Sequence, residues 1–375
     1  MSEFKYNLPS SLTFDNYTYF EKELRDALGN KDIDHLILDA ENTNYISSAG
    51  LRVILSFKNK YQNLEVINTS TEVYDVFQMT GFTNIISVSR AFRKVSIEGC
   101  PCIGKGAHGL VYRLAPDTIV KVYYDEHTTL EDIKCERELS KKAFVMGLPT
   151  AIALDIVKVG DSYGTVFELL NASSCAKYIN ESKENTDHFI DKAVAILKHI
   201  HGIKSTDNDL PDMKRYSYVY LDKVKEFFDE ETFAKVKDLI DSIPDTNTLL
   251  HGDFHLKNQL MVGDELMLID MDTLSIGDPI FELASICNSY YEFARLDKRA
   301  VESFLDISVE KAEYIWKQLS RKYYSDLDDE QYNHMCNKIM VLGCMRALHF
   351  FKKRNYPQEL FEHCLSDLKE ALALI

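Results

Sequence analysis

The sequence predicts a two-domain protein in which a small α/β sandwich over residues 1–93 precedes a larger α+β domain over residues 98–375. The length of 375 residues suits two or three domains of about 100–200 residues each. Strand-like and helix-like segments alternate over the first 95 residues, whereas the later part ends in a long helical region. The charge is also uneven, because residues 1–95 carry 10 basic and 12 acidic side chains and the remainder carries 33 and 47.

The first domain shows a strand–helix–strand–helix–strand order. The expected strands are His35–Asp39, Leu64–Ile67 and Asn84–Val88, and the expected helices are Ser48–Tyr61 and Thr71–Thr80. Thr71 is placed to cap the second helix at its start, and Gly81 is placed to end it. This order predicts a sandwich with helices on one or both faces of a sheet.

The composition changes after residue 90. We place the domain boundary near Arg93, with no Pro-rich or Ser-rich linker after it. Residues 103–170 show strands, one helix and further strands, and the chain from about residue 186 is mostly helical. Short strands and loops interrupt the helical part at Leu249–Ile280.

The overall composition excludes several classes of protein. A net charge of −16 repels phosphate backbones and argues against nucleic acid as a partner. The start of the chain has no apolar signal region, and no run approaches the roughly 18 apolar residues that cross a bilayer. We therefore expect a cytoplasmic protein without a membrane partner, whose eight cysteines are reduced thiols. Cys100 and Cys102 lack a second close pair that would complete a zinc site.

A glycine-rich segment opens the second domain. Residues 104–111, GKGAHGLV, have the pattern G-x-G-x-x-G-x-V, which nucleotide-binding folds of several kinds share. Here a strand follows the glycines, then a turn, then a second strand, Thr118–Tyr123, that carries Lys121. A glycine hairpin followed by a strand lysine is the arrangement of kinases. Without a Cβ atom, the glycine backbone can bring its N–H groups close to phosphates.

Lys121 needs an acidic partner to hold it in place. Glu136 and Glu138 lie on the next expected helix, Leu130–Met146, and we favour Glu136. Taken alone, these residues would be interpreted as a surface lysine and a solvated charged helix.

The most specific motif lies further along the chain. Residues 249–258, LLHGDFHLKN, contain H-G-D-x-x-x-x-N, and LMLIDMD follows at 266–272. Asp253 suits a carboxylate that orients an attacking hydroxyl and accepts its proton, while Asn258 and Asp270 offer oxygen ligands for Mg²⁺, with Asp272 as a further candidate. An isolated His-Gly-Asp would be a loop turn, but here all the motifs occur in kinase order.

Neighbouring polar and aromatic residues have simpler explanations. His255 lacks ligands at zinc spacing, so we expect loop packing or an acceptor contact. Asp278 and Pro279 suit the N-cap and first position of a helix, with Glu282 one turn further. The aromatic and acidic run after residue 289 could cage a cation, but helix core and surface is the favoured interpretation.

These motifs resemble the aminoglycoside phosphotransferase and choline kinase-like family, a branch of the bilobal protein-kinase-like fold, across residues 103–375. The resemblance implies an N-lobe over about 98–168 and a C-lobe over about 172–375. It implies that Asp253 is the catalytic base, that Lys121 and Glu136 form the catalytic ion pair, and that Asn258 and Asp270 hold Mg²⁺. The residues implied to bind ATP are Gly104, Gly106, Gly109, Lys121, Glu168 and Leu170, the last two in a hinge near 167–170. Lys257 departs from the family pattern.

The first domain resembles STAS domains, the fold of bacterial anti-sigma-factor antagonists, through residues 44–55, NYISSAGLRVIL. In that family a serine at this helix start is phosphorylated, and the position corresponds to Ser48, with Ser47 where relatives often have Asp. A phosphate is stabilised at a helix N-terminus by free N–H groups. The simpler alternative is that one of these serines only caps the helix.

The sequence thus predicts a bacterial cytosolic fusion of a STAS-like domain and an ATP- and Mg²⁺-dependent phosphotransferase. Three hypotheses remain for its action. The phosphate acceptor is the hydroxyl of a small molecule, or the enzyme is a protein serine kinase acting on Ser48 or another STAS protein, or ATP gates a STAS interaction without turnover. A protein partner at the STAS domain is expected in the latter two.

Overall fold

The computed structural model describes residues 2–375 except 107–108, 126, 207–209, 297 and 355. The chain divides into two compact units, one formed by residues 1–96 with 157–161 and the other by residues 97–156 with 162–375. Among the described residues, no helix has both the length and the apolar composition that a membrane crossing requires. Ala107 and His108, at the tip of the glycine motif, lie outside the described residues.

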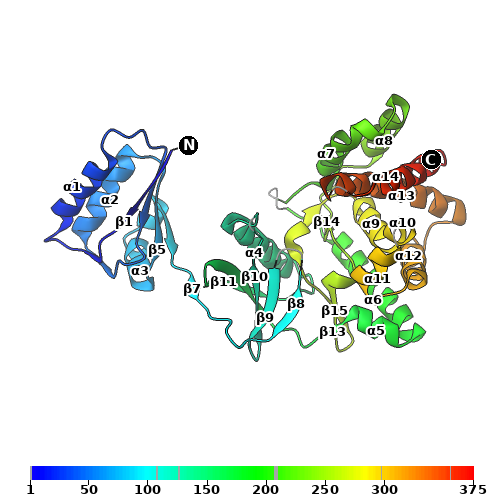
Figure 1. The fold of residues 1–375 in the computed structure, drawn as a ribbon, viewed down its shortest axis with the longest axis horizontal. Helices are drawn as coiled ribbons and strands as arrows, with labels where there is room; N and C mark the ends of the chain where they lie inside the picture. The colour runs from blue at the N-terminus through cyan, green and yellow to red at the C-terminus, as the bar shows by residue number, and fades with distance from the viewer. Residues whose placement is uncertain (1, 107–108, 126, 207–209, 297, 355) are drawn as a thin grey trace. The chain divides into compact units, whose positions relative to one another are not determined.

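The first unit contains a four-stranded parallel sheet with the strand order β1-β3-β5-β6. Its elements are β1 (Glu3–Asn7), β2 (Ser11–Leu12), α1 (Tyr17–Leu28), β3 (His35–Asp39), β4 (Tyr45–Ile46), α2 (Ser48–Lys60), β5 (Leu64–Thr69), α3 (Thr71–Met79), η1 (Phe82–Asn84), β6 (Ser87–Arg90) and β7 (Arg93–Lys94). Helices α1 and α2 lie side by side against the sheet (Figure 1). Their apolar faces pack with the strands into one core, which confirms the predicted α/β class.

Two local predictions for this unit are wrong. The N-cap of α3 is Ser70, whose hydroxyl accepts a hydrogen bond from the Val73 N–H, and Thr71 is already the first helical residue. The last strand starts at Ser87 rather than Asn84. The reason is Gly81, whose φ of +76° leads from the helix end into a 3-10 turn before the chain can extend.

The second unit begins with an N-lobe built around a twisted hairpin sheet. Its elements are β8 (Cys102–Lys105), β9 (Gly109–Ala115), β10 (Thr118–Tyr123), α4 (Leu130–Val145), β11 (Ala153–Val159) and β12 (Ser162–Glu168). The strands follow the order β11-β12-β10-β9-β8, with β8, β9, β10 and β12 paired antiparallel. Alternation along β10 buries Val120 and Val122 and leaves Lys121 on the opposite face.

The C-lobe is mainly helical. Its helices are α5 (Cys175–Glu181), α6 (Lys183–Gly202), α7 (Met213–Val224), η2 (Lys225–Phe227), α8 (Glu230–Ser242), η3 (Leu256–Asn258), η4 (Met271–Thr273), α9 (Pro279–Cys287), the π-helix η5 (Asn288–Glu292), α10 (Phe293–Leu296), α11 (Lys298–Leu305), α12 (Val309–Tyr323), α13 (Asp329–Arg354) and α14 (Gln358–Leu372). Its strands are β13 (Ser173–Ser174), β14 (Leu249–Leu250), β15 (Gln259–Val262), β16 (Glu265–Leu268) and β17 (Ser275–Ile276). The pairs β14–β17 and β15–β16 fix the segment that carries the H-G-D-x-x-x-x-N motif.

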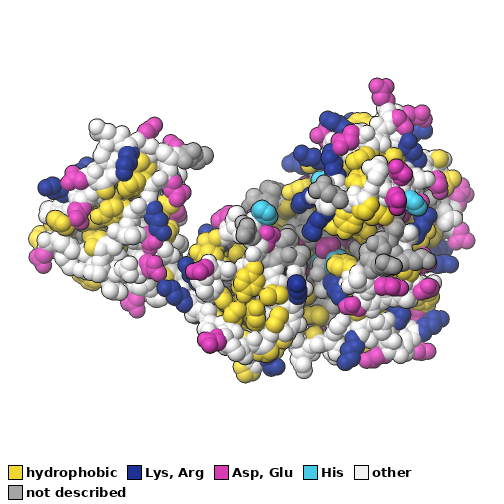
Figure 2. Space-filling view, viewed as in Figure 1, with side chains coloured by type: hydrophobic (Ala, Val, Ile, Leu, Met, Phe, Trp, Pro, Cys, Tyr) yellow, Lys and Arg dark blue, Asp and Glu magenta, His cyan; other side chains and the backbone are white. Residues whose placement is uncertain are grey.

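Charged side chains are mixed over the visible surface. Figure 2 shows Asp and Glu side chains interspersed with Lys and Arg. On this face the negative net charge is therefore spread out rather than collected into one acidic patch.

Candidate active site

Lys121 joins the two lobes of the second unit. Its Nζ lies 2.7 Å from Glu136 Oε1 on α4 and 3.0 Å from Asp270 Oδ1 after β16. Burial alone would lower the pKa of Lys121, but the negative charges of Asp270 and Glu136 outweigh it and raise the pKa above its ordinary value. The other candidate, Glu138, instead pairs with Arg137 at 2.7 Å.

The glycine hairpin is shaped by close approach of its own strands. The Gly106 N–H donates to the Gly109 carbonyl at 2.9 Å. A Cβ on Gly109 would lie 2.3 Å from the Val122 carbonyl oxygen of the neighbouring strand, whereas one on Gly104 would meet nothing closer than 3.4 Å. Gly109 is thus required by the hairpin itself, in addition to any need for close approach to phosphate.

Asp253 lies in a hydrogen-bonded loop before η3. Asn258 donates from Nδ2 to the Asp253 carboxylate and to its backbone carbonyl, both at 3.0 Å. The Nε2 atom of His255 lies 3.1 Å from Asp253 Oδ2, and the His255 ring packs edge-on against Phe304. Burial would raise the pKa of Asp253, but the hydrogen bond and charge of His255 and the charge of Arg346 lower it to about 2. Asp253 is therefore ionised at neutral pH.

Glu282 holds the backbone of this loop, a role that sequence analysis missed. Its fully buried carboxylate accepts hydrogen bonds from the His251 N–H at 2.7 Å and the Gly252 N–H at 2.8 Å. Gly252 has a φ of +86°, and a Cβ there would lie 2.3 Å from the Thr273 carbonyl oxygen. Glu282 reaches the loop because α9 starts where predicted, with Asp278 as its N-cap and proline at its first position.

Arg346 is a second functional candidate that the motifs did not reveal. It donates from Nη2 to the Gly252 carbonyl oxygen at 3.1 Å from the middle of α13. His201 lies 3.6 Å from the buried Glu282 carboxylate and contacts the Tyr323 hydroxyl at 2.7 Å. Arg346 and His201 stand in long helical stretches without a local motif, so only the packing of distant helices identifies them.

The carboxylates of Asp270 and Asp272 crowd the Lys121 end of the site. Asp270 adopts a left-handed backbone with φ of +65°, a strained state that is frequent at functional sites. Asp272 is exposed, yet the surrounding protein and the charges of Asp270 and Glu136 raise its pKa to about 7. Asp253 adds to the same effect. The excess negative charge and the available carboxylate and amide oxygens fit a hard divalent cation, which prefers oxygen ligands.

The remaining predicted residues lie at the edges of this arrangement. Glu168 ends β12, and its N–H donates to the Ile152 carbonyl at 3.1 Å. Leu170 follows in the half-buried segment that leads toward the C-lobe. Lys257 forms an ion pair with Asp306 on the surface.

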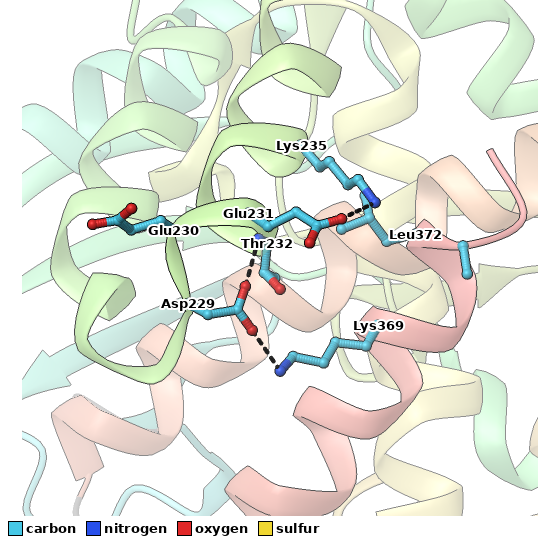
Figure 3. A pocket seen from close by; sticks show the side chains of 8 residues that line it. Asp229, Glu230, Glu231, Thr232, Lys235, Lys369 and Leu372 are labelled. Carbon is cyan, nitrogen blue, oxygen red and sulfur yellow. Dashed lines mark hydrogen bonds and ion pairs between the residues drawn. The ribbon is translucent and has the colours of Figure 1, made fainter.

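A depression of about 580 Å³ on the C-lobe lies apart from these residues, between α8 and α14. Figure 3 shows its charged lining, in which Asp229 contacts Thr232 and Lys369, and Glu231 contacts Lys235. These groups neutralise one another, so the depression has the character of a solvated helix junction.

The two serines of the STAS-like motif differ in the structure. Ser47 is the N-cap of α2, and its hydroxyl accepts a hydrogen bond from the Gly50 N–H at 3.3 Å. Ser48 is exposed in the first turn and has no hydrogen-bond partner among the residues that the structure describes. A Cβ on Gly50 would lie 2.8 Å from Leu12 Cβ, so this glycine lets α2 approach the β2 segment.

Comparison with protein families identifies both units. The family model described as the phosphotransferase enzyme family matches residues 101–313, and the STAS domain model matches residues 3–96. The chain therefore belongs to the phosphotransferase enzyme family and carries an N-terminal STAS domain, as the motifs predicted. It is a phosphotransferase. No curated protein matches the chain.

Solved structures with similar folds include phosphotransferases and kinases of small molecules. The gentamicin complex of APH(2″)-IIa has 16% identity and a TM-score of 0.48, covering 82% of this chain and 99% of that one. A choline/ethanolamine kinase family protein from Mesorhizobium loti has 15% identity and a TM-score of 0.44, covering 73% and 91%. The ethanolamine kinase of Plasmodium vivax has 14% identity and a TM-score of 0.46, covering 72% and 80%.

Proposed function

We propose that this enzyme transfers the γ-phosphate of ATP to the hydroxyl of a small molecule in a Mg²⁺-dependent reaction, with the STAS domain as a regulatory or interaction module. The observation that carries this proposal is the meeting of Lys121, Glu136 and Asp270 at 2.7 and 3.0 Å, although Lys121 and Asp270 are 149 positions apart. The Asp253–Asn258 pair faces the same group of carboxylates.

Each residue has a distinct role in this proposal. Lys121, held by Glu136, binds the ATP phosphates under the glycine hairpin, and the segment near Glu168 and Leu170 contacts the adenine. Asp270, Asp272 and the Oδ1 atom of Asn258 would hold Mg²⁺, which when bound neutralises the phosphate charge. The donor set supports this assignment, since Asn258 uses its Nδ2 atom on Asp253 and leaves its oxygen for a cation.

Asp253 orients the acceptor. Because its pKa is about 2, it is an ionised hydrogen-bond acceptor for the incoming hydroxyl at every physiological pH. The hydroxyl oxygen forms a bond to the γ-phosphorus, the bond to the leaving oxygen of ADP breaks, and the hydroxyl proton passes to the Asp253 carboxylate. His255 and Asn258 keep this carboxylate in position throughout.

A protein acceptor is the second candidate. The exposed Ser48 hydroxyl, without a described partner at the start of α2, favours it as a phosphorylation site. A phosphate there would be stabilised by the helix N-terminus and would change the charge of this face of the STAS domain.

The test uses the full chain and separates these cases. Pure protein is incubated with Mg-ATP, or with Mg-GTP to check the nucleotide, and phosphate is mapped by intact and peptide mass spectrometry. A panel of amino alcohols, sugars and aminoglycosides is then assayed, with Asp253→Asn as the control. Turnover of a panel compound supports the proposal. Phosphate on Ser48 that is absent from the control favours the protein kinase. If there is no turnover, no protein phosphate and no thermal stabilisation by ATP, both the small-molecule and the protein-acceptor hypotheses are overturned.

A further inference from the structure

A second group of chemically reactive side chains lies in the helical C-lobe. Glu292 ends the π-helix η5, Cys344 lies in α13 and Cys364 lies in α14. Their potential ligand atoms, one carboxylate oxygen and two sulfurs, all lie within 4.8 Å of one another, and all three residues are buried. We call these three residues the thiol–carboxylate cluster. None of them takes part in the phosphotransfer chemistry described above.

The carboxylate in this cluster has little support from the surrounding protein. Glu292 has 0% exposure, and neither of its carboxylate oxygens has a partner at full hydrogen-bond geometry in the described part of the chain. A weaker interaction comes from the Cys344 thiol of the same cluster. Burying such a group without partners is costly, and native proteins pair nearly all buried polar atoms. Burial and the charge of Asp367 raise the pKa of Glu292 to about 7, although the charge of Arg295 and the Cys344 thiol oppose this rise. A bound cation would provide the missing partner.

We propose that Glu292, Cys344 and Cys364 bind one Zn²⁺ ion. Thiolate sulfur and carboxylate oxygen are both ligand types that zinc takes in proteins, whereas Mg²⁺ and Ca²⁺ prefer oxygen alone. Bond lengths of about 2.0–2.3 Å place the ligand atoms of a tetrahedral site roughly 3.5–3.8 Å apart, so separations within 4.8 Å require only small side-chain movements. Each thiol releases its proton to solvent on binding.

A third thiol lies nearby. Cys287 ends α9, is fully buried, and interacts electrostatically with both Glu292 and Cys344. Its sulfur is not in the group of atoms within 4.8 Å of one another, so Cys287 is a candidate for the remaining tetrahedral position only after a side-chain movement. The zinc site would then take ligands from α9, η5, α13 and α14, and would hold the C-terminal helical hairpin against the helix that carries Glu282.

This placement gives the ion a structural role near the catalytic loop. Cys344 lies between Gly343, whose carbonyl accepts a hydrogen bond from Asn288 at 2.9 Å, and Arg346, which contacts the Gly252 carbonyl oxygen. An ion at Cys344 would therefore hold the turn of α13 that contacts the loop. The metal site itself does not depend on the phosphotransferase proposal, and its test measures metal directly.

The alternative is that the thiols pack as small apolar groups and Glu292 stays protonated. The Cys364 thiol does contact the Cys344 carbonyl oxygen at 3.4 Å, as a reduced thiol can. Cobalt distinguishes the two cases, because Co²⁺ bound by thiolates gives intense near-ultraviolet charge-transfer absorption and tetrahedral visible bands. A protonated cluster gives neither.

The experiment uses the full chain, produced in zinc-supplemented medium and kept reduced. We expect one zinc per chain by elemental analysis, a lower melting temperature after removal of zinc with a chelator, and thiolate–cobalt bands on reloading with Co²⁺. No retained zinc together with no thiolate–cobalt absorption would overturn the proposal.

Variants assign the ligands. Cys344→Ala and Cys364→Ala should abolish the thiolate–cobalt bands, while Cys175→Ala, at an equally buried cysteine outside the cluster, should keep them. Glu292→Gln preserves side-chain size and should weaken zinc binding by at least the ~10–100-fold that loss of an outer hydrogen-bonding partner causes. It keeps the test decisive if an alanine variant fails to fold. Unchanged metal affinity in Glu292→Gln, or equal bands in Cys344→Ala and Cys175→Ala, would contradict the assignment.

Discussion

The loop at residues 251–258, which we propose is catalytic, and the start of α2 at residues 47–50 are both short polar motifs at the edge of a helix. Their contacts differ in kind. The loop is held by partners from other elements, since Glu282 accepts from its backbone N–H groups and Arg346 donates to the Gly252 carbonyl. At α2, within the described part of the chain, the only hydrogen bond of the two serine hydroxyls is local, from the Gly50 N–H to Ser47.

The difference shows what kind of evidence each motif provides. A capping serine is fully explained by its own helix, so its presence says little about chemistry. A loop whose backbone is held by two separate helices, α9 and α13, and whose aspartate is held by Asn258 and His255, is positioned more accurately than folding alone requires. The effects of substitutions in the two regions should therefore differ in size and in the property that changes, which is turnover for the loop and local stability for α2.

Asp253→Asn should have the largest effect. It should lower the turnover number by about 10²–10⁴-fold, the range typical for loss of a general base, because the amide cannot accept the hydroxyl proton. Thermal stability should change little by comparison. The measurement is phosphate transfer to the best acceptor, beside Asp264→Asn, an exposed aspartate paired with His188 and Lys192. Equal activity of Asp253→Asn and the wild type would show that the loop does not act on the acceptor.

The sequence predicted the parts of this site that follow local rules. The strand around Lys121, the Glu136 helix and the H-G-D-x-x-x-x-N loop were located because kinase motifs have fixed spacing and order. The structure also contains the expected ion pair of Lys121 with Glu136, whereas Glu138 pairs with Arg137. The catalytic and metal-binding roles of these residues stay predictions.

Other parts could not be predicted because they depend on packing between distant elements. Glu282 stands in α9, which is buried from Ile280 to Cys287, and Arg346 stands in the long helix α13. Only the meeting of α13, α9 and the loop gives these two residues their partners. The thiol–carboxylate cluster likewise collects residues from three helical segments at irregular spacing. The errors at Ser70 and Ser87 are shifts of one and three residues, at turns where neighbouring residues have similar propensities.

Glu282→Gln should have the next largest effect. The glutamine amide can accept one of the two loop N–H bonds but turns an N–H₂ donor toward the other, so a buried donor is left unpaired. We expect a loss of about 2–4 kcal/mol in stability together with reduced turnover. Chemical denaturation and activity are compared with Glu265→Gln, an exposed position. A stable variant with normal turnover would mean that the loop is held by other contacts.

Asp272→Asn should have a smaller effect of opposite sign on stability. The folded-state pKa of Asp272, about 7, lies above its unfolded value of 3.8, so the folded metal-free protein binds more protons and loses stability as pH rises from about 4 to 7. The variant removes this loss, and its melting temperature should exceed that of the wild type increasingly over this interval. Because Asp272 is exposed, the gain should stay below the Glu282 effect.

Saturating Mg-ATP should make the wild type more stable than Asp272→Asn, which reverses the order of their melting temperatures. The wild type gains a ligand interaction at Asp272 that the amide weakens, so added Mg-ATP should raise its melting temperature more. The measurement is a melting curve at each pH with and without Mg-ATP. A variant that is no more stable than the wild type at pH 8 without Mg-ATP would contradict the proposed crowding of carboxylates.

The serines of α2 should give the smallest effects and the clearest contrast. Ser47→Ala removes the cap and should cost about 1 kcal/mol, whereas Ser48→Ala, at an exposed site without a described partner, should stay within ~0.5 kcal/mol. Hydrogen exchange of the first α2 amides in the full chain measures this locally, and 1 kcal/mol corresponds to roughly fivefold faster exchange. If Ser48→Ala costs as much as Ser47→Ala, Ser48 has a structural contact and is not a free hydroxyl. If it costs nothing, the Ser48 hydroxyl makes no structural contact and is free to accept phosphate, and phosphotransfer to Ser48 becomes the experiment that decides between a cap and a switch.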